Sequence, residues 1–293
     1  MTEITASLVK DLRERTGAGM MDCKKALVEA NGDIEAAIDI LRKKGLSKAA
    51  KKGDREASAG VVAVKVEGNK GVVVEVNSET DFVARNEKFQ TFVKKVADVA
   101  YNENGNIEKI KSATIDGMPV ADALANEIAT IGENLNIRRS DMVEVSNGAV
   151  ISYIHNRVAE GMGMIAVLVG IESSADKAKI MEVGDTIAMH IAASAPAFLN
   201  IADVDEASLE REKAIFRDTA MQSGKPAEIV EKMINGRINK YYEEVVLNEQ
   251  AFFMEPSKKI KDVVKSISDD AKIVKFVRFA VGDGVEHKEE ADA

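Results

Sequence analysis

The feature of the sequence that most constrains the fold is a pattern of paired, valine-rich segments that occurs twice. In the first copy, apolar residues alternate over 62–66, turn-forming residues follow, and alternation resumes over 72–76. Such period-two alternation predicts two antiparallel strands joined as a hairpin. A second copy is present at 148–154 and 163–169. Each hairpin precedes a segment whose apolar residues recur every three or four positions, so we predict a duplicated unit of hairpin, loop and helix.

The two copies are expected to differ in their connections. We predict a short turn in the first hairpin and a longer, polar connection over 155–162 in the second. The loop after the first hairpin contains Phe82, whereas the corresponding loop over 172–176 has no aromatic residue. Only 4% of the residues are aromatic and none is Trp, so composition does not explain a Phe in a polar loop.

Two interpretations of the first loop stay open from the residues alone. In one, Thr80 or Asp81 caps the following helix and Phe82 or Val83 is a hydrophobic staple that fixes the entry of the chain. In the other, Asp81 and Phe82 form an exposed recognition tip between a rigid strand and a rigid helix. The absence of an aromatic residue from the second copy favours recognition.

The residues before the repeat predict three short helices over 1–45. Met20 lies on the apolar stripe of the second helix. The adjacent Met21 points elsewhere, and the pattern leaves open whether it packs against the first helix. Arg and Lys are abundant over 42–58, which we interpret as a helix end that runs into a solvated hinge. A nucleic-acid patch is the less favoured alternative, because no aromatic residues are interleaved for stacking.

The rest of the chain is mostly helix-periodic. A segment over 121–131 predicts a helix between the two copies. A highly charged stretch over 205–242, with turn residues at 223–226, predicts an antiparallel helical hairpin that projects from the body. The chain then returns to the second copy through a helix opened by Pro256 and Ser257 and a last strand over 273–281.

The residues do not predict an active site. The histidines His155, His190 and His287 have no catalytic or metal-binding spacing, and Cys23 is the only cysteine. We interpret His190 as a helix-packing residue and His155 as structural. The sequence contains no nucleophile elbow, dinucleotide fingerprint or phosphate loop. We therefore expect no metal, no cofactor and no catalytic residue.

Charge and hydropathy exclude further classes of protein. The formal net charge is -9, whereas a general nucleic-acid binder is usually basic. No apolar run is long enough to span a membrane, and the first residues do not resemble a signal peptide. One cysteine is typical of a reducing cytoplasm. The residues alone thus predict a multidomain interaction protein, in which Phe252, Phe253 and Met254 belong either to the core or to an interface.

Several strings of residues resemble bacterial elongation factor Ts. The strings lie at 16–27, 32–35, 80–83, 131–134, 189–193, 221–226 and 254–257. The string at 80–83 reads Thr-Asp-Phe-Val, and the string at 131–134 reads Ile-Gly-Glu-Asn. They occur in the family's order and cover nearly the whole chain.

The resemblance implies an α+β multidomain fold. An N-terminal three-helix, ubiquitin-associated-like domain would precede a core of two related α/β subdomains with a projecting antiparallel helical hairpin, a coiled coil. The implied boundaries are 1–55 for the helical domain and basic linker, 56–147 for core subdomain N, 148–195 plus 229–282 for core subdomain C, 196–228 for the hairpin, and 283–293 for a disordered acidic tail. Longer family members end in a further helix that packs on their partner protein. We expect the contact between such a helix and the partner to be absent or reduced here.

The resemblance also implies a function in cytoplasmic protein biosynthesis. The family acts as the guanine-nucleotide exchange factor of the GTPase elongation factor Tu, without covalent chemistry. It promotes GDP release by disturbing the magnesium and phosphate site, and GTP then rebinds. The matching partner-binding residues are Thr80, Asp81, Phe82, Val83, Lys10, Arg13, Met20, Met21, Lys24, Ile131, Gly132 and His155. The alternative is a non-catalytic scaffold or chaperone-like factor, and a dimer of heterodimers stays open.

Overall fold

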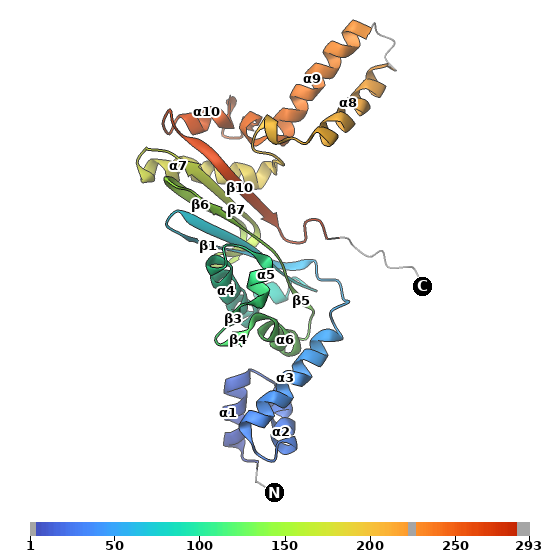
Figure 1. Cartoon of the computed structure of the whole chain (residues 1–293), viewed down its shortest axis with the longest axis vertical. Helices are drawn as coiled ribbons and strands as arrows, with labels where there is room; N and C mark the ends of the chain where they lie inside the picture. Colours follow the sequence, from blue (N-terminus) through green and yellow to red (C-terminus); the bar gives the residue numbers. More distant parts are fainter. Residues whose placement is uncertain (1–3, 222–226, 286–293) are drawn as a thin grey trace.

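The structure, a computed structural model, describes residues 4–221 and 227–285. A six-stranded antiparallel sheet lies in the middle of the molecule, a three-helix module at one end, and two long helices at the other (Figure 1). The strands of the sheet are β1 (Ala59–Glu67), β2 (Lys70–Ser78), β5 (Leu135–Glu144), β6 (Gly148–Ala159), β7 (Met162–Glu172) and β10 (Lys272–Ala280). The mixed α and β composition agrees with the prediction.

Both copies of the repeat contribute to this one sheet. β1 and β2 form the first hairpin, β6 and β7 form the second, and the pairing of Val62 with Gly163 joins them. Each hairpin begins with a glycine at positive φ, Gly60 at 118° and Gly148 at 130°. A side chain at either glycine would collide with the backbone of the paired strand. The same local feature at the same position of both hairpins supports the predicted duplication.

The two hairpins face each other across a core of their own. Val62, Val73 and Leu168 lie together in this core. The opposite face of the first hairpin packs against α4 (Glu87–Asn102), and that of the second against α7 (Lys177–Ser194). The strands are therefore buried on both faces, which explains why consecutive residues, and not only alternate ones, are apolar.

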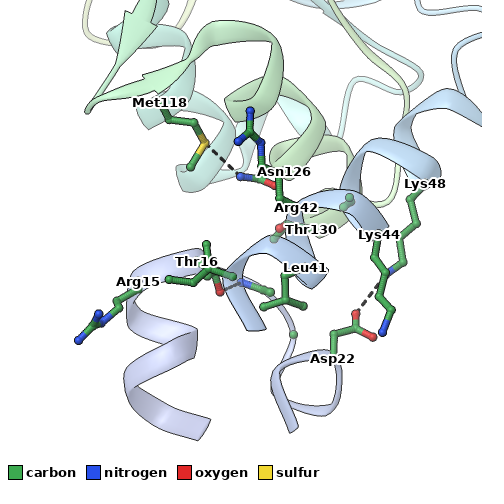
Figure 2. Close-up of a pocket in the computed structure, with 15 residues that line it drawn as sticks. Arg15, Thr16, Asp22, Leu41, Arg42, Lys44, Lys48, Met118, Asn126 and Thr130 are labelled. Atoms are coloured by element: carbon green, nitrogen blue, oxygen red, sulfur yellow. Dashed lines mark hydrogen bonds and ion pairs between the residues drawn. The ribbon is translucent and has the colours of Figure 1, made fainter. Parts of the chain in front are cut away.

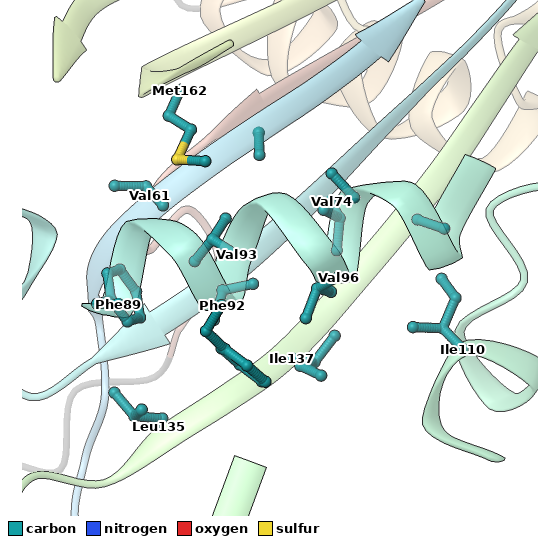
Figure 3. Packing of buried hydrophobic residues seen from close by; sticks show 14 of the residues in the cluster. Val61, Val74, Phe89, Phe92, Val93, Val96, Ile110, Leu135, Ile137 and Met162 are labelled. Carbon is teal, nitrogen blue, oxygen red and sulfur yellow. The ribbon is translucent and has the colours of Figure 1, made fainter. Parts of the chain in front are cut away.

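Helix α4 supplies much of the core beside the first hairpin. Phe89, Val93 and Val96 lie on one side of α4 and are buried against Val74 and Ile137 (Figure 3). Burying one such side chain contributes about 1.5–3 kcal/mol. The loop between β2 and α4 thus begins and ends on firmly held elements.

The second hairpin differs from the prediction of a long polar connection. β6 and β7 continue to a tight turn at Glu160 and Gly161, where Gly161 has a φ of 72°. The polar residues His155 and Arg157 lie within β6 and are exposed there, opposite Ile165 and Gly163. The prediction was wrong because these polar side chains belong to an exposed stretch of strand and not to a loop.

Four elements between the copies were not predicted: strand β5, helix α5 (Ile107–Ser112) and the short strands β3 (Thr114–Ile115) and β4 (Met118–Pro119). α5 occupies the expected polar connection, and β5 pairs with β2. The charges of Arg138 and Arg139 hide the strand character of β5 in the sequence. Arg139 Nε lies 2.5 Å and Arg138 Nη1 lies 3.1 Å from carboxylate oxygens of Glu75, which is fully buried on β2. A buried ion pair thus occupies a place where the pattern calls for apolar residues.

Burial alone would raise the pKa of the Glu75 carboxyl, but hydrogen bonds oppose it. Asn77 Nδ2 donates at 2.9 Å and the backbone N–H of Gly282 donates at 2.8 Å, in addition to Arg139. Together these bonds and the Arg139 charge lower the pKa of Glu75. Because Gly282 follows β10, this network also connects the end of the second copy to the first.

The N-terminal module contains the three predicted helices. They are α1 (Ala6–Thr16), α2 (Met20–Glu29) and α3 (Ile34–Ala50). Thr5 Oγ1 accepts from the N–H of Leu8 at 3.2 Å to begin α1, and Asp33 Oδ1 accepts from that of Ala36 at 3.0 Å to begin α3. Leu12 and Leu27 are fully buried at the centre of the module.

The predicted helix end in the basic segment at 42–58 is present, but the helix extends past residue 45, where the three predicted helices were expected to end. α3 continues to Ala50 and lies against α6 (Val120–Ile131), a helix that matches the predicted one. Arg42 pairs with Asp122, and Gly45 is buried beside Asn126. The end of the helix was predicted too early because the cations alternate with small residues that pack on α6, and this packing fixes the module to the core.

The two long helices are α8 (Glu206–Met221) and α9 (Ala227–Val245), and they extend away from the sheet (Figure 1). Val230 and Ile234 of α9 are buried against the partly buried Phe216 of α8. α9 runs through the expected hairpin boundary at 228 without a break. The predicted turn at 223–226 and residues 286–293 of the tail predicted at 283–293 lie outside the described residues, whereas the N–H of Asp283 donates to the carbonyl of Ala280 at 3.2 Å.

The C-terminal helix begins later than predicted. α10 (Ile260–Lys265) starts where Asp262 accepts from the N–H of Lys259 at 3.2 Å, whereas Pro256 and Ser257 belong to strand β9 (Glu255–Lys259). The remaining short elements are η1 (Val83–Arg85), η2 (Ile201–Asp203), η3 (Leu247–Glu249) and β8 (Ala251–Phe252). No helix in the described part of the chain is long and apolar enough to cross a membrane.

Candidate functional site

The loop between β2 and α4, residues 79–85, is the most exposed apolar feature of the core and is called the Phe82 loop below. Phe82 is 80% exposed, and Thr80 and Asp81 beside it are exposed as well. Val83, the next residue, is only 5% exposed and packs in the core beside α4. The loop therefore anchors itself with Val83 and presents Phe82 to solvent.

The capping interpretation of this loop was wrong. The N-cap of α4 is Asn86, whose Oδ1 accepts from the backbone N–H of Lys88 at 2.9 Å and of Phe89 at 3.3 Å. A turn of 3-10 helix, η1, lies between Asp81 and Asn86, so Thr80 and Asp81 are too far from the helix start to cap it. Phe82 makes no staple, because its side chain is exposed, whereas Val83, the other predicted staple, is buried in the core beside α4. The recognition interpretation is the one that agrees with this geometry.

The Phe82 loop is bound to the turn that follows α6. Thr80 donates its backbone N–H to Glu133 Oε2 at 2.9 Å and its hydroxyl to Glu133 Oε1 at 2.7 Å. In return, the backbone N–H of Asn134 donates to Glu79 Oε1 at 2.6 Å. The predicted residues Ile131 and Gly132 directly precede this turn, and Gly132 ends α6 with a φ of 91°. The structure thus brings the strings at 80–83 and 131–134 together.

The predicted residues of the N-terminal module lie on exposed faces of α1 and α2. Met20 is 57% and Met21 64% exposed, so the expectation that Met20 belongs to the core stripe was wrong. Both residues stand in the first turn of α2, before the helix reaches the packed centre of the module. Lys24, one turn later, is exposed, as are Lys10 and Arg13 on α1. These side chains form an apolar and basic surface on the module.

His155 belongs to the second hairpin. It is exposed on β6, and its Nδ1 lies 3.3 Å from the hydroxyl of Tyr153. The structural role that the pattern favoured for this histidine is limited to that contact. The predicted residues therefore lie on three parts of the chain: the module, the Phe82 loop with its neighbouring turn, and the second hairpin.

The segment Phe252 to Met254 divides between core and surface. Phe252 is buried beside His190, whereas Phe253 is 50% and Met254 is 59% exposed. His190 is a packing residue, as predicted: its Nε2 lies 2.9 Å from Gln250 Oε1, and the N–H of Phe253 donates to its Nδ1 at 3.4 Å. Burial lowers the pKa of His190, and the hydrogen bond to Gln250 partly opposes that shift.

A small cavity lies where the module meets the core (Figure 2). It has a volume of about 100 Å³ and lies between α3 and α6, beside Leu41, Arg42 and Asn126. Its cationic side chains are engaged with carboxylates, as in the pairs of Arg42 with Asp122 and of Lys48 with Asp22 at 3.0 Å. We interpret this cavity as part of the packed seam between module and core.

Within residues 4–221 and 227–285, no group of three or more His, Cys, Asp and Glu side chains could hold a metal ion. The sequence reasoning missed Glu79, Asn86 and Glu133, although Glu133 lies in one of the quoted strings. The feature of the sequence that indicates a role for Glu133 is an acidic residue directly after a helix-ending glycine. What the described surfaces offer is apolar and charged contact with another macromolecule.

Comparisons with known proteins agree on one family. The family model described as Elongation factor TS matches residues 79–283 of the chain. A protein named Elongation factor Ts from Maricaulis maris is 54% identical over 300 residues, covering 100% of this chain and 96% of that protein. The protein of the same name from Bartonella bacilliformis is 55% identical over 295 residues, covering 99% of this chain and 96% of its own. A third, from Paramagnetospirillum magneticum, is 53% identical over 298 residues.

Proposed function

The chain belongs to the elongation factor Ts family, whose members are the nucleotide exchange factors of elongation factor Tu, and we propose that its Phe82 loop drives GDP release from that GTPase. The observation that carries this proposal is the 80% exposure of Phe82 beside the exposed Asp81, on a loop that is anchored at both ends. An exposed aromatic on a rigid base is typical of an interface anchor.

The physical argument starts from how a GTPase holds GDP. Backbone amides of a phosphate-binding loop and a magnesium ion bind the nucleotide, and both require a well-defined geometry. An apolar side chain that displaces a helix next to them weakens GDP binding without touching the nucleotide. Linkage makes the effect reciprocal, so GDP lowers the affinity of the exchange factor by the same factor. The chain would act through binding alone, with no covalent chemistry.

Phe82 cannot supply the whole effect. A ten-thousandfold weakening of GDP binding corresponds to roughly 5.5 kcal/mol of coupling, whereas burying one Phe contributes about 1.5–3 kcal/mol. We therefore propose that the other surfaces share the contact. The base of the Phe82 contact would comprise Thr80, Asp81 and Val83, and the contact beside it would comprise Ile131 and Gly132. The rest of the interface would come from His155 of the second hairpin and from the module residues Lys10, Arg13, Met20, Met21 and Lys24.

We also propose the domain division that the resemblance implies. Residues 1–55 would form the ubiquitin-associated-like domain with its basic linker, and 56–147 would form the first subdomain. The second subdomain would comprise 148–195 and the residues after α9 up to 282, because the projecting hairpin, predicted at 196–228, extends to the end of α9 at Val245. Support comes from the shared order of hairpin, helix and return strand in both copies. As a translation factor the protein would act in the cytoplasm. Light scattering on the complex with elongation factor Tu would distinguish one heterodimer from a dimer of heterodimers.

The direct test is GDP release from elongation factor Tu, followed by stopped flow with a fluorescent GDP. The wild-type chain is expected to accelerate release, and Phe82→Ala to reduce the second-order rate constant by about 10- to 100-fold, from the burial of one Phe. Ile215→Ala, which removes an apolar side chain of 48% exposure on α8, is the matched control and should retain the wild-type rate. Binding to elongation factor Tu without any acceleration of release would favour the scaffold alternative instead.

A further inference from the structure

We propose that Glu133 is a positioning residue, which holds the Phe82 loop in the conformation that engages the GTPase. This inference rests on the function proposed above. Its basis is the reciprocal pair of carboxylate contacts between the Phe82 loop and the turn after α6, which brackets the residues directly before Phe82.

Glu133 acts on the loop where the sheet no longer holds it. The ladder between β2 and β5 ends at the pairing of Ser78 with Leu135, and the η1 turn begins with the bond from the N–H of Ala84 to the carbonyl of Asp81 at 3.2 Å. Between these points, both donors of Thr80 bind the two oxygens of Glu133. When a carboxylate accepts two hydrogen bonds from one residue, it fixes both the position and the orientation of that donating residue.

The turn that carries Glu133 is itself held from the module side. Lys52 Nζ donates to the carbonyl oxygen of Gly132, and Asn134 Nδ2 donates to that of Arg55 at 2.7 Å. Arg55 Nη1 also lies 3.5 Å from Glu79. The segment after α3 therefore fixes the turn, and the turn fixes the loop. A loop that is ordered before it binds loses less conformational entropy on binding, which favours both affinity and rate.

The second copy of the repeat has a similar contact without an aromatic residue. There the backbone N–H of Ser174 donates to Asp270 Oδ2 at 2.9 Å, and Asp270 lies in the segment before the return strand, as Glu133 does. The contact can therefore serve the fold as well as the partner. A test of the positioning role needs a readout that depends on Phe82.

The test combines Glu133→Ala with Phe82→Ala in the GDP-release assay on elongation factor Tu. We expect Glu133→Ala to lower the second-order rate constant about tenfold, which is about 1.4 kcal/mol. Glu133→Gln should lie between Glu133→Ala and wild type, because its amide offers one acceptor oxygen in place of two. In the Phe82→Ala background, removal of Glu133 should change the rate less than about twofold, since the two residues act as one unit.

Two further measurements complete the design. Glu144→Ala removes the same type of side chain from the other, exposed end of β5 and should leave the rate unchanged. Hydrogen–deuterium exchange on the free protein should be faster over 79–85 in Glu133→Ala, with no change in β5 near Glu144.

The outcomes separate the two proposals. An active wild-type chain with an unchanged rate for Glu133→Ala, or with equal losses in both Phe82 backgrounds, would overturn the positioning role. A wild-type chain that does not accelerate release would overturn the proposed function. In that case unchanged exchange over 79–85 in Glu133→Ala would overturn the positioning role separately.

Discussion

The loops that follow the two hairpins can be compared residue by residue. Each runs from a buried strand to a helix, and each has a backbone N–H bound to a carboxylate from the segment before its return strand. The first loop contains an extra turn, η1, and leaves Phe82 80% exposed. The second closes on itself: Ser173 is 3% exposed, its hydroxyl lies 2.6 Å from that of Ser268, and it accepts from the N–H of Ala175 at 3.0 Å. A few residues on a repeated frame thus separate an outward-facing loop from a closed one.

The strands before these loops also differ at one equivalent position. Glu75 pairs with Val62, two residues after Gly60, and Gly170 pairs with Val150, two residues after Gly148. In the first copy this position holds a buried carboxylate with two arginines. In the second it holds a glycine, packed so closely that a side chain would meet Val143 Cγ1 at 2.7 Å. One copy stabilises this position by charge and the other by close packing.

The largest effect is expected at Glu75. Glu75→Ala leaves the partly buried Arg138 and Arg139 without their carboxylate partner, and loss of one partner of a buried ion pair costs about 3–5 kcal/mol. The free energy of unfolding from urea titration should fall by that amount, whereas Glu144→Ala should leave it nearly unchanged. The pKa of Glu75 is lower in the folded state than its ordinary value of 4.5. The stability that Glu75 contributes is therefore present above pH 4.5 and is lost as the pH falls through the folded-state pKa. A change below 1 kcal/mol would contradict the charge-based account of the first copy.

A smaller effect is expected at the equivalent glycine. Gly170→Ala places a methyl group against Val143, Val145 and Val274, and overpacking of a core typically costs about 1–3 kcal/mol. The same titration measures it, and Gly68→Ala would be a poor control because Gly68 has a φ of 62°. Gly236→Ala on α9 is a suitable control, because no atom beyond its own helix backbone and chain neighbours lies within 4 Å of the added methyl group, and Ala favours a helix over Gly, so stability should not fall. If Gly170→Ala leaves the free energy of unfolding unchanged, the packing around residue 170 has space for a methyl group.

The second copy also carries a titratable group in its helix, at His190. Burial lowers its pKa from the ordinary 6.5, so the folded state favours the neutral imidazole. The stability it contributes is fully present above pH 6.5 and is lost as the pH falls through the lower folded-state pKa. The thermal midpoint should therefore decrease on acidification through this range, and His190→Gln should weaken that dependence. An identical pH dependence in both proteins would exclude His190 as its source.

The smallest effect is expected at Asp270, the counterpart of Glu133. Asp270→Ala removes the acceptor of the Ser174 N–H, which lies in a solvent-exposed contact, so the thermal midpoint should decrease only slightly. GDP release from elongation factor Tu should keep the wild-type rate, because no aromatic residue depends on this loop. A loss of exchange activity as large as that of Glu133→Ala would end the distinction between the two loops.

The sequence predicted most elements because the helices show the period of burial on one face, and the hairpin strands show short valine-rich runs bounded by turn residues. It failed where other physics decides the structure. β5 was missed because Arg138 and Arg139 are paired inside the fold, and a pattern of apolar residues cannot report a partner on another strand. Met20 was assigned to the core because helical periodicity does not show where packing begins along a helix. The exposure of Phe82 agrees with the recognition interpretation, but the contact of Thr80 with Glu133 joins residues 53 positions apart and has no local signal in the sequence.

The place where α8 and α9 leave the body has a consequence for how such chains vary. The backbone N–H groups of Ala197 and Phe198 both donate to the carbonyl of Val245, at 2.9 and 3.0 Å, and that of Leu247 donates to the carbonyl of Phe198 at 2.8 Å. The segment that leads into α8 and the segment that follows α9 are thus hydrogen-bonded to each other where the arm meets the body. Since the entropy of closing a loop grows only slowly with its length, the segment between can be lengthened, trimmed or exchanged for another domain while the two ends stay in register. The length and sequence of the projecting arm can therefore change, in evolution or by engineering, without a change in the sheet that carries it.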